Sequence, residues 1–253
     1  HWHAWKPGRL HDINSDLRSG QSVELTEAEA AFLKRVIDLS KQSNHTFNPT
    51  IGELIHLWGF HTDDYPITSP PPSPEAIKQL AEQQLTVNNL QLNQLNLSAD
   101  NPHIWLDFGG IAKGLAVDQA VAVIRRHGIH NAIVNAGGDL RSIGHKGNRN
   151  WRIGIQSPVD NGVIAVLKIT GDEAVFTSGN YQRYKVFDGK RYPHIIDSHS
   201  GQPVQDIISA TVIAPDGVIA DAAATALIVA GMEGWQKIAK NLQLDKVLLV
   251  DHK

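Results

Sequence analysis

Two oxygen-bearing side chains, Asp221 and Thr225, stand four residues apart in the alanine-rich stretch 220–227. The alanines favour a helix, on which residues at positions i and i+4 project from one face. A carboxylate and a hydroxyl so placed are hard oxygen ligands suited to Mg²⁺ or Ca²⁺. A first-turn aspartate stabilised by the helix dipole is the simpler alternative, and spacing alone favours it.

A glycine-rich turn lies between an apolar run at 104–108 and a second helical pattern. Gly109 and Gly110 precede apolar residues at helical spacing, namely Val117, Val121 and Ile124. Glycines let a backbone approach a ligand closely, and the amino end of a helix attracts phosphate. The motif is neither a dinucleotide fingerprint nor a P-loop, because Gly114 follows Lys113. An ordinary strand-to-helix turn and a phosphate site are therefore equally supported.

A histidine follows the second strand of a predicted hairpin. His194 precedes Asp197 and a turn around Gly201. A loop side chain held by a rigid scaffold can face a pocket, and an imidazole with an ordinary pKa near 6.5 can serve as a general base. A histidine that only shapes the loop through hydrogen bonds is the alternative, and the local sequence alone favours it.

Helices are predicted from capping residues and apolar spacing. Thr26 and Glu29 form a capping box before a periodic apolar stretch, and Ser73 with Pro74 begins a helix through Leu80. A short helix after Pro49-Thr50 ends at Gly59. Further helices are expected after Gly110, at 220–227 and at 235–242.

Strands are predicted from short apolar runs and turn residues. The Asp188-Gly189 pair is the strongest hairpin signal. A loose alternation over 85–97 predicts another hairpin. The remaining strands are expected at 104–108, 130–135, 151–156, 163–169, 175–179, 184–187, 191–196, 210–214 and 246–251. The first two flank a helix, which predicts a parallel crossover unit.

The composition of the chain limits the partners and the kinds of site that the protein can have. The chain has 253 residues, of which 42% are hydrophobic, enough for a sizeable core. A net charge of −3 and the lack of long basic runs argue against nucleic acid as a partner. The absence of cysteine excludes disulfides and cysteine metal sites. No apolar stretch is expected to reach the roughly 18 residues of a membrane span.

Several motifs occur together in one order and resemble the ApbE family of FAD:protein FMN transferases, also called flavin transferases. They span residues 45–231, most of the chain. The matching runs are Phe47-Asn48-Pro49-Thr50 with Leu57-Trp58-Gly59-Phe60, Leu106-Asp107-Phe108-Gly109-Gly110-Ile111-Ala112-Lys113-Gly114 with Asp118, Asn135-Ala136-Gly137-Gly138-Asp139, Thr177-Ser178-Gly179-Asn180-Tyr181, His194-Ile195-Ile196-Asp197 with Gly201, and Ala220-Asp221 with Thr225.

The resemblance implies an activity and a set of roles. The activity is Mg²⁺-dependent transfer of FMN from FAD to a threonine hydroxyl of an acceptor flavoprotein, with release of AMP. Asp221, Thr225 and the Ala112 carbonyl are expected to bind the metal, and His194 is the expected active-site histidine. The residues expected to contact FAD are Thr46, Phe47, Asn48, Gly109, Gly110, Leu115 and Ile195. Two other functions stay open: FAD hydrolysis to FMN and AMP, and noncatalytic FAD binding.

The chain departs from the family pattern at three places. Asn48 and Asn180 stand where aspartate is usual, and Ser198-His199-Ser200 replaces the commoner Pro-x-Thr. The amides should mainly change hydrogen bonding, whereas the third departure puts the loop after His194 in question. Lys113 suits either a phosphate contact or a salt bridge, and Trp5 receives at most a stacking role.

The expected fold class is α+β, with a mixed, largely antiparallel sheet and packed helices. A single domain is expected over residues 1–253. Two interlocked halves are one way in which this domain could be arranged. The resemblance places the protein in the periplasm or anchored on the outer side of the inner membrane. No signal segment is visible, and the chain begins at His1 rather than Met.

Overall fold

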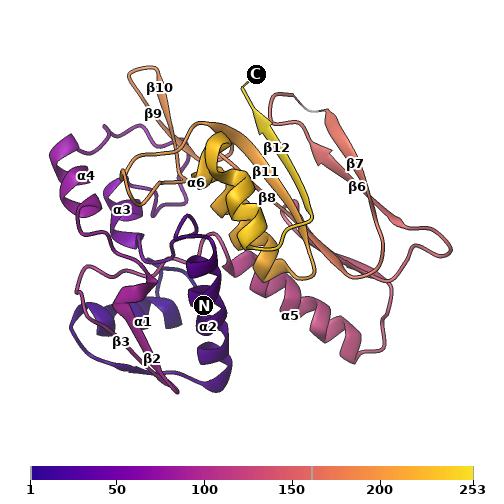
Figure 1. Cartoon of the computed structure of the whole chain (residues 1–253), viewed down its shortest axis with the longest axis horizontal. Helices are drawn as coiled ribbons and strands as arrows, with labels where there is room; N and C mark the ends of the chain where they lie inside the picture. Colours follow the sequence, from indigo (N-terminus) through magenta and orange to yellow (C-terminus); the bar gives the residue numbers. More distant parts are fainter. Residues whose placement is uncertain (1, 161, 253) are drawn as a thin grey trace. The chain divides into compact units, whose positions relative to one another are not determined.

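The structure is a computed structural model that describes residues 2–160 and 162–252 (Figure 1). The chain divides into two compact units. Unit 1 comprises His1–Gly110 and Gln182–Gln205, and unit 2 comprises Ile111–Tyr181 and Asp206–Lys253. Each unit is thus built from two segments of chain. The single domain expected over residues 1–253 stays a prediction.

Unit 1 holds the first four α-helices of the chain. The capping box predicted at Thr26 is confirmed, since its hydroxyl accepts from the Glu29 amide and the Glu29 carboxylate accepts from the Thr26 amide. The Ser73 cap is confirmed as well. Helix α1 (Arg9–Arg18) was not predicted, although Leu10, Ile13 and Leu17 lie at helical spacing on its buried face. The helices are α1 (Arg9–Arg18), α2 (Glu27–Gln42), α3 (Gly52–Leu57) and α4 (Pro74–Ala81), followed by the 3₁₀ turn η1 (Val87–Asn89).

Two small antiparallel sheets complete unit 1. One has the strand order β1 (Val23–Glu24), β3 (Asn96–Ala99), β2 (Leu90–Asn93), which confirms the second predicted hairpin. The other is the hairpin of β9 (Tyr184–Phe187) and β10 (Lys190–Pro193). Asp188 and Gly189 have φ angles of 50° and 73° at its turn, which is the left-handed geometry that this dipeptide favours. The second strand ends at Pro193 rather than at residue 196.

The strand predicted at 104–108 is wrong. Trp105 makes one isolated bridge with Ile51, and the neighbouring backbone groups find other partners. The Asn14 side chain donates to the Leu106 carbonyl at 2.9 Å and accepts from the Leu106 amide at 2.7 Å. Because a side chain satisfies both groups, the segment is extended without joining a sheet. The predicted parallel crossover is therefore also wrong.

Unit 2 is built on a five-stranded sheet with every neighbouring pair antiparallel. Its order is β12 (Lys246–Asp251), β11 (Ile207–Ala214), β8 (Glu173–Gly179), β5 (Asp139–Ile143), β4 (Ala132–Ala136). The strands predicted at 151–156 and 163–169 are confirmed as β6 (Trp151–Gln156) and β7 (Val163–Ile169), which pair antiparallel in a separate two-stranded sheet. Two helices, α5 (Ala112–Arg126) and α6 (Gly217–Asn241), pack on the larger sheet and on each other (Figure 1).

Strand β8 lies between two layers of unit 2, helix α6 on one face and the β6–β7 hairpin on the other. Phe176 lies close to Gly217 at the start of α6, and Ser178 bonds to Thr225 on the same helix. Val175, on the opposite face, belongs to a core cluster with Ile153 and Ile169 of the β6–β7 hairpin. Successive side chains of β8 point to opposite faces of the sheet, so the Ser178 hydroxyl faces the helices while Val175 packs in the core on the other face.

Both helices expected at 220–227 and 235–242 lie within α6, which consists of two helical stretches joined at a kink. Gly231 interrupts its geometry with a φ of 67°, and the Asp206 carboxylate accepts from the Met232 amide at 2.7 Å beyond this kink. By length and composition α6 could cross a membrane, so the expectation of no such stretch is corrected. Of its apolar window, 56% is buried, and the helix packs on β8 and β11, as a core helix does.

Candidate functional site

Asp221 is a buried carboxylate near the start of α6 in unit 2. The residue is 2% exposed, and its Oδ2 accepts from the Gly114 amide at 2.9 Å. Burial raises the pKa of Asp221 to about 7, although the Lys113 ammonium and backbone amides act in the opposite direction. A carboxylate so buried gains from a nearby cation, so its environment suits a metal ligand.

Thr225 lies one helical turn after Asp221, as the spacing predicted. Its hydroxyl is 3.1 Å from the Ser178 hydroxyl of β8. No individual role was predicted for Ser178. Its contact with α6 could not be predicted without the position of β8 in the sheet. The two hydroxyls and the carboxylate provide oxygen atoms of the kind that Mg²⁺ binds.

Ala112, the third expected ligand, is the first residue of α5. The Gly114–Asp221 hydrogen bond ties this first turn to α6. No three histidine, aspartate or glutamate side chains gather into a metal cluster within residues 2–160 and 162–252. The implied ligand set is of another kind, with one carboxylate, one hydroxyl and one backbone carbonyl, and the buried Asp221 fits it.

Lys113 forms an ion pair with Asp139 of β5. The other Asp139 oxygen accepts from the Thr177 amide at 2.8 Å, and Asp139 is 4% exposed. Of the two interpretations of Lys113, the salt bridge is therefore the one seen here. Sequence spacing alone could not identify Asp139 as the partner, because 26 residues separate the two.

Asp118 and Arg141 hold the start of α6 in place. Arg141 Nη1 donates to Asp118 Oδ1 at 2.6 Å, and the same oxygen accepts from the Gly217 amide at 2.9 Å. A Cβ added to Gly114 would lie 2.2 Å from the Gly217 carbonyl oxygen. The two helices approach through glycine at this point, which positions Asp221 against the first turn of α5.

The residues Thr46, Phe47 and Asn48 of unit 1 form a tightly bonded turn. The Thr46 hydroxyl donates to the Ser43 carbonyl at 2.8 Å, and Phe47 is 3% exposed. Asn48 Nδ2 donates to the Leu85 carbonyl at 2.8 Å, which an aspartate could not do. The Phe47 side chain is part of the core, and the Phe47 amide donates to the Ser43 hydroxyl at 3.2 Å.

The other expected flavin contacts lie in both units. Gly109 is exposed and Gly110 half-buried at the end of the first segment of unit 1. Leu115 is half-buried on α5 of unit 2. Ile195, in unit 1, is 7% exposed, so its side chain is mostly core. The exposed glycine turn is the member of this set best placed to meet a ligand.

His194 lies just after β10 in unit 1, and its tautomer follows from one contact. Its Nδ1 is 3.1 Å from the Arg183 carbonyl oxygen, and its ring meets the Phe60 ring edge-on at 6.4 Å between centroids. A carbonyl only accepts, so Nδ1 carries the hydrogen in the neutral imidazole. Nε2 then carries the lone pair, as a general base requires.

The loop after His194 is organised by Asp197, although its sequence departs from the family. The carboxylate accepts from the His199 amide at 3.0 Å and from the Ser200 hydroxyl at 2.7 Å. Burial raises the pKa of Asp197, but these hydrogen bonds outweigh it and the net shift is downward. Ser200 therefore gives this loop a hydroxyl partner for Asp197.

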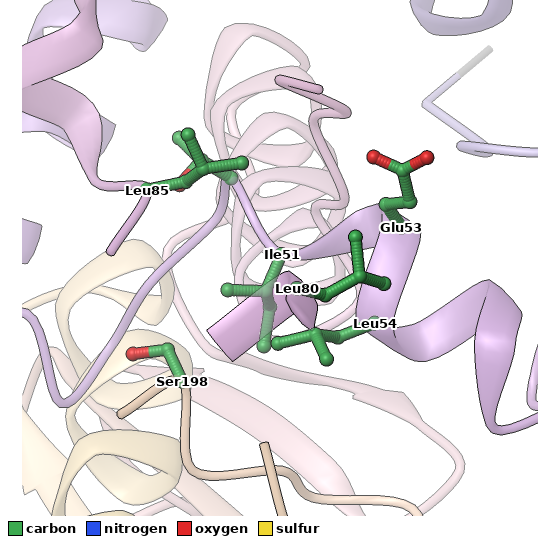
Figure 2. Close-up of a pocket in the computed structure, with 7 residues that line it drawn as sticks. Ile51, Glu53, Leu54, Leu80, Leu85 and Ser198 are labelled. Carbon is green, nitrogen blue, oxygen red and sulfur yellow. The ribbon is translucent and has the colours of Figure 1, made fainter. Parts of the chain in front are cut away.

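A pocket opens in unit 1 beside these segments (Figure 2). Its cavity volume is about 10 Å³, roughly the room that one water molecule needs. Figure 2 shows Ile51, Leu54 and Leu80 close together in its wall. The complete lining consists of Thr50, Ile51, Glu53, Leu54, Leu80, Leu85 and Ser198. The wall is mostly apolar, and Thr50, Glu53 and Ser198 are its polar members.

Comparison with known proteins decides the family. The family model described as "ApbE family" matches residues 1–248. The chain belongs to the ApbE family. It is 37% identical over 98% of its length to a Rhodobacter capsulatus protein named FAD:protein FMN transferase, and 34% identical over 89% of its length to the Escherichia coli K12 protein of that name.

Solved ApbE structures have the same fold. The ApbE protein of Thermotoga maritima superposes with a TM-score of 0.86 at 33% identity, covering 96% of this chain and 78% of that one. The Vibrio cholerae flavin transferase ApbE gives a TM-score of 0.81 at 31% identity, covering 96% and 77%. The predicted α+β class is thus confirmed for this member of the ApbE family.

The chain spans only part of its curated relatives. It covers 47% of the length of the Rhodobacter capsulatus protein and 66% of the Escherichia coli protein. The matched part contains every motif that carried the family resemblance.

Proposed function

We propose that this ApbE-family chain transfers FMN from FAD to a threonine hydroxyl of an acceptor flavoprotein. The threonine oxygen attacks the phosphorus of the FMN half, the bond to the AMP phosphate breaks, and AMP leaves. The names of the relatives support the donor and the transferred group. The observation in this chain that carries the proposal is the buried Asp221 carboxylate, with Thr225 one turn away.

Asp221, Thr225 and the Ala112 carbonyl would hold Mg²⁺. The metal would neutralise charge on the FAD diphosphate and on the departing AMP. Asp118 and Arg141 contribute by fixing the start of α6, and the Gly114 amide holds one oxygen of Asp221. These contacts preorganise the carboxylate, so little rearrangement accompanies binding.

His194 would take the proton from the acceptor threonine. Its Nδ1–H donates to the Arg183 carbonyl, which orients the ring and places the lone pair on Nε2, the atom that would accept the proton. General-base help of this kind contributes roughly 10²–10⁴-fold to a rate. The proton moves from the threonine oxygen to Nε2 as the new bond to phosphorus forms.

The residues that would contact FAD are those of the Thr46–Asn48 turn, the Gly109–Gly110 turn, Leu115 and Ile195. Location in the periplasm or on the outer side of the inner membrane is a further proposal, which rests on the family resemblance and which fractionation of cells would test.

The metal assignment predicts the behaviour of Asp221→Ala. This variant removes a hard ligand rather than core volume, so the fold should persist while FAD turnover is lost. Wild type and variant are incubated with FAD, Mg²⁺ and an acceptor flavoprotein, and the products are separated by chromatography. Normal Mg²⁺-dependent turnover by Asp221→Ala would refute the assignment.

A further inference from the structure

A second histidine in unit 1 forms a buried pair with a carboxylate. His61 Nε2 lies 2.9 Å from Asp107 Oδ2, and the two side chains are 4% and 14% exposed. Asp107 belongs to the motif that precedes the glycine turn, whereas His61 follows α3 and lies outside every run that carries the family resemblance. The expected flavin and metal contacts do not include either residue.

The same carboxylate fixes the glycine turn. Asp107 Oδ1 accepts from the Gly109 amide at 2.7 Å, and the Asp107 amide donates to the Pro49 carbonyl at 2.8 Å. Pro49 directly follows Asn48, so Asp107 joins two segments expected to contact FAD. A Cβ on Gly109 would lie 3.0 Å from Asp107 Oδ1, which shows how closely the turn folds over this oxygen.

The surroundings of His61 determine which nitrogen carries its hydrogen. A carboxylate only accepts, so the hydrogen that points at Asp107 is on Nε2. Nδ1 is buried and has no hydrogen-bond partner among residues 2–160 and 162–252. The tautomer with its hydrogen on Nε2 therefore directs that hydrogen at Asp107 and leaves no buried donor without an acceptor.

Aromatic rings hold His61 in this orientation. The Trp5 ring stacks on it at 6.1 Å between centroids and an interplanar angle of 18°, and the Trp105 ring lies at 5.0 Å. His56 is a third neighbour at 5.7 Å. A ring fixed on several sides points one N–H at Asp107 and has little freedom to leave it.

We propose that His61 is a positioning residue for flavin binding. By donating to Asp107, it fixes the carboxylate that holds the Gly109 amide, so the Gly109–Gly110 turn has its binding shape before FAD arrives. The FAD part of this proposal rests on the proposed function. The link from His61 to the Gly109 amide does not.

The test compares His61→Phe, which keeps a ring but loses the donor, with His61→Gln, which keeps an N–H. A matched control is His103→Gln, because His103 pairs with Glu53 at 2.9 Å but is 46% exposed and does not touch the glycine turn. FAD affinity is measured by flavin fluorescence and transfer at saturating FAD by single turnover. Exchange of the Gly109 amide with deuterium is measured without FAD.

The proposal predicts that His61→Phe weakens FAD binding by roughly 10-fold or more, the loss typical of a hydrogen bond to a charged group. Transfer at saturating FAD should change much less, since the chemical groups are untouched. Gly109 exchange should accelerate in free protein. His61→Gln should recover part of both effects, and His103→Gln should resemble wild type.

Unchanged Gly109 exchange in His61→Phe would overturn the proposal, and so would equal losses in His61→Phe and His61→Gln. If wild type binds no FAD while Gly109 exchange responds as expected, the proposed function fails and the positioning link stands. Should His61→Phe not fold, Asp107→Asn replaces it. An amide has only one oxygen for the two donors of Asp107, so either Gly109 exchange should accelerate or the His61 hydrogen should leave Nε2 in ¹⁵N spectra, and no change in either would contradict the pairing.

Discussion

Replacing Asp221 by asparagine should make the metal-free protein more stable at pH 8. The pKa of Asp221 is raised from 3.8 to about 7 by burial, so the folded state disfavours the ionised carboxylate. Each tenfold change in proton affinity is equivalent to about 1.4 kcal/mol, so this rise in pKa corresponds to about 4 kcal/mol as an upper bound. Asparagine is neutral at every pH and keeps an oxygen that can accept from the Gly114 amide.

The direction of the pH dependence follows from linkage. Between pH 4 and 7 the unfolded chain has ionised Asp221, whereas the folded protein keeps it protonated, so the contribution of Asp221 to stability falls as pH rises. Above pH 7 both states are ionised and this contribution levels off. The gain from Asp221→Asn should therefore be absent near pH 4, grow toward pH 7 and remain constant above it.

Urea unfolding in EDTA, followed by circular dichroism at several pH values, measures this difference. Asp216→Asn is the matched control, since Asp216 caps the same helix and asparagine caps equally well. Adding Mg²⁺ should stabilise wild type and not Asp221→Asn, because the metal binds only the charged ligand. A pH-independent difference, or equal stabilisation of both proteins by Mg²⁺, would refute this account of Asp221.

Three further predictions concern the proposed general base His194, the contact between α5 and α6 at Gly114, and the helix cap at Thr26. His194→Gln should cut FMN transfer by roughly 10²–10⁴-fold with little change in FAD affinity, as single-turnover kinetics and fluorescence would show, whereas lost affinity with a normal rate would make His194 a binding residue. Gly114→Ala should lower stability in urea by at least about 1–3 kcal/mol, because its Cβ would meet the Gly217 carbonyl at 2.2 Å, while the control Gly234→Ala in α6 should not. Thr26→Ala should cost about 1 kcal/mol through loss of the capping box, and an unchanged urea midpoint would contradict this.

Local signals predicted much of the secondary structure. The Thr26 cap, the Ser73 cap and the Asp188-Gly189 turn act through neighbours only three or fewer residues away, so the sequence carries their whole cause. The strands at 151–156 and 246–251 were predicted with the bounds that they have. Their apolar residues alone are enough to define them.

Prediction failed where a distant partner decides the outcome. The run 104–108 has the composition of a strand, yet Asn14, 92 residues away, satisfies the backbone of Leu106 in place of a neighbouring strand. The break between the two helices expected at 220–227 and 235–242 was predictable, but its contact was not, because Asp206 accepts from the Met232 amide from outside the helix. No local pattern contains these partners, so propensity alone could not reveal them.

The candidate site shows the same division. The i, i+4 relation of Asp221 and Thr225 is local and was predictable, whereas the contact of Thr225 with Ser178 depends on sheet order. The Lys113–Asp139 pair and the His61–Asp107 pair also join residues far apart in sequence. The family resemblance supplied roles for individual residues, and the structure shows which neighbours support them.

Intact mass spectrometry of an acceptor flavoprotein is the most direct test of FMN transfer. A candidate acceptor is co-expressed with this chain, and in parallel with Asp221→Ala, and a threonine-to-alanine acceptor serves as control. We expect one FMN phosphoester on the wild-type acceptor, none with either variant, and AMP released in equal amount in the purified reaction. Consumption of FAD to free FMN and AMP, with the acceptor mass unchanged, would contradict transfer and identify water as the acceptor.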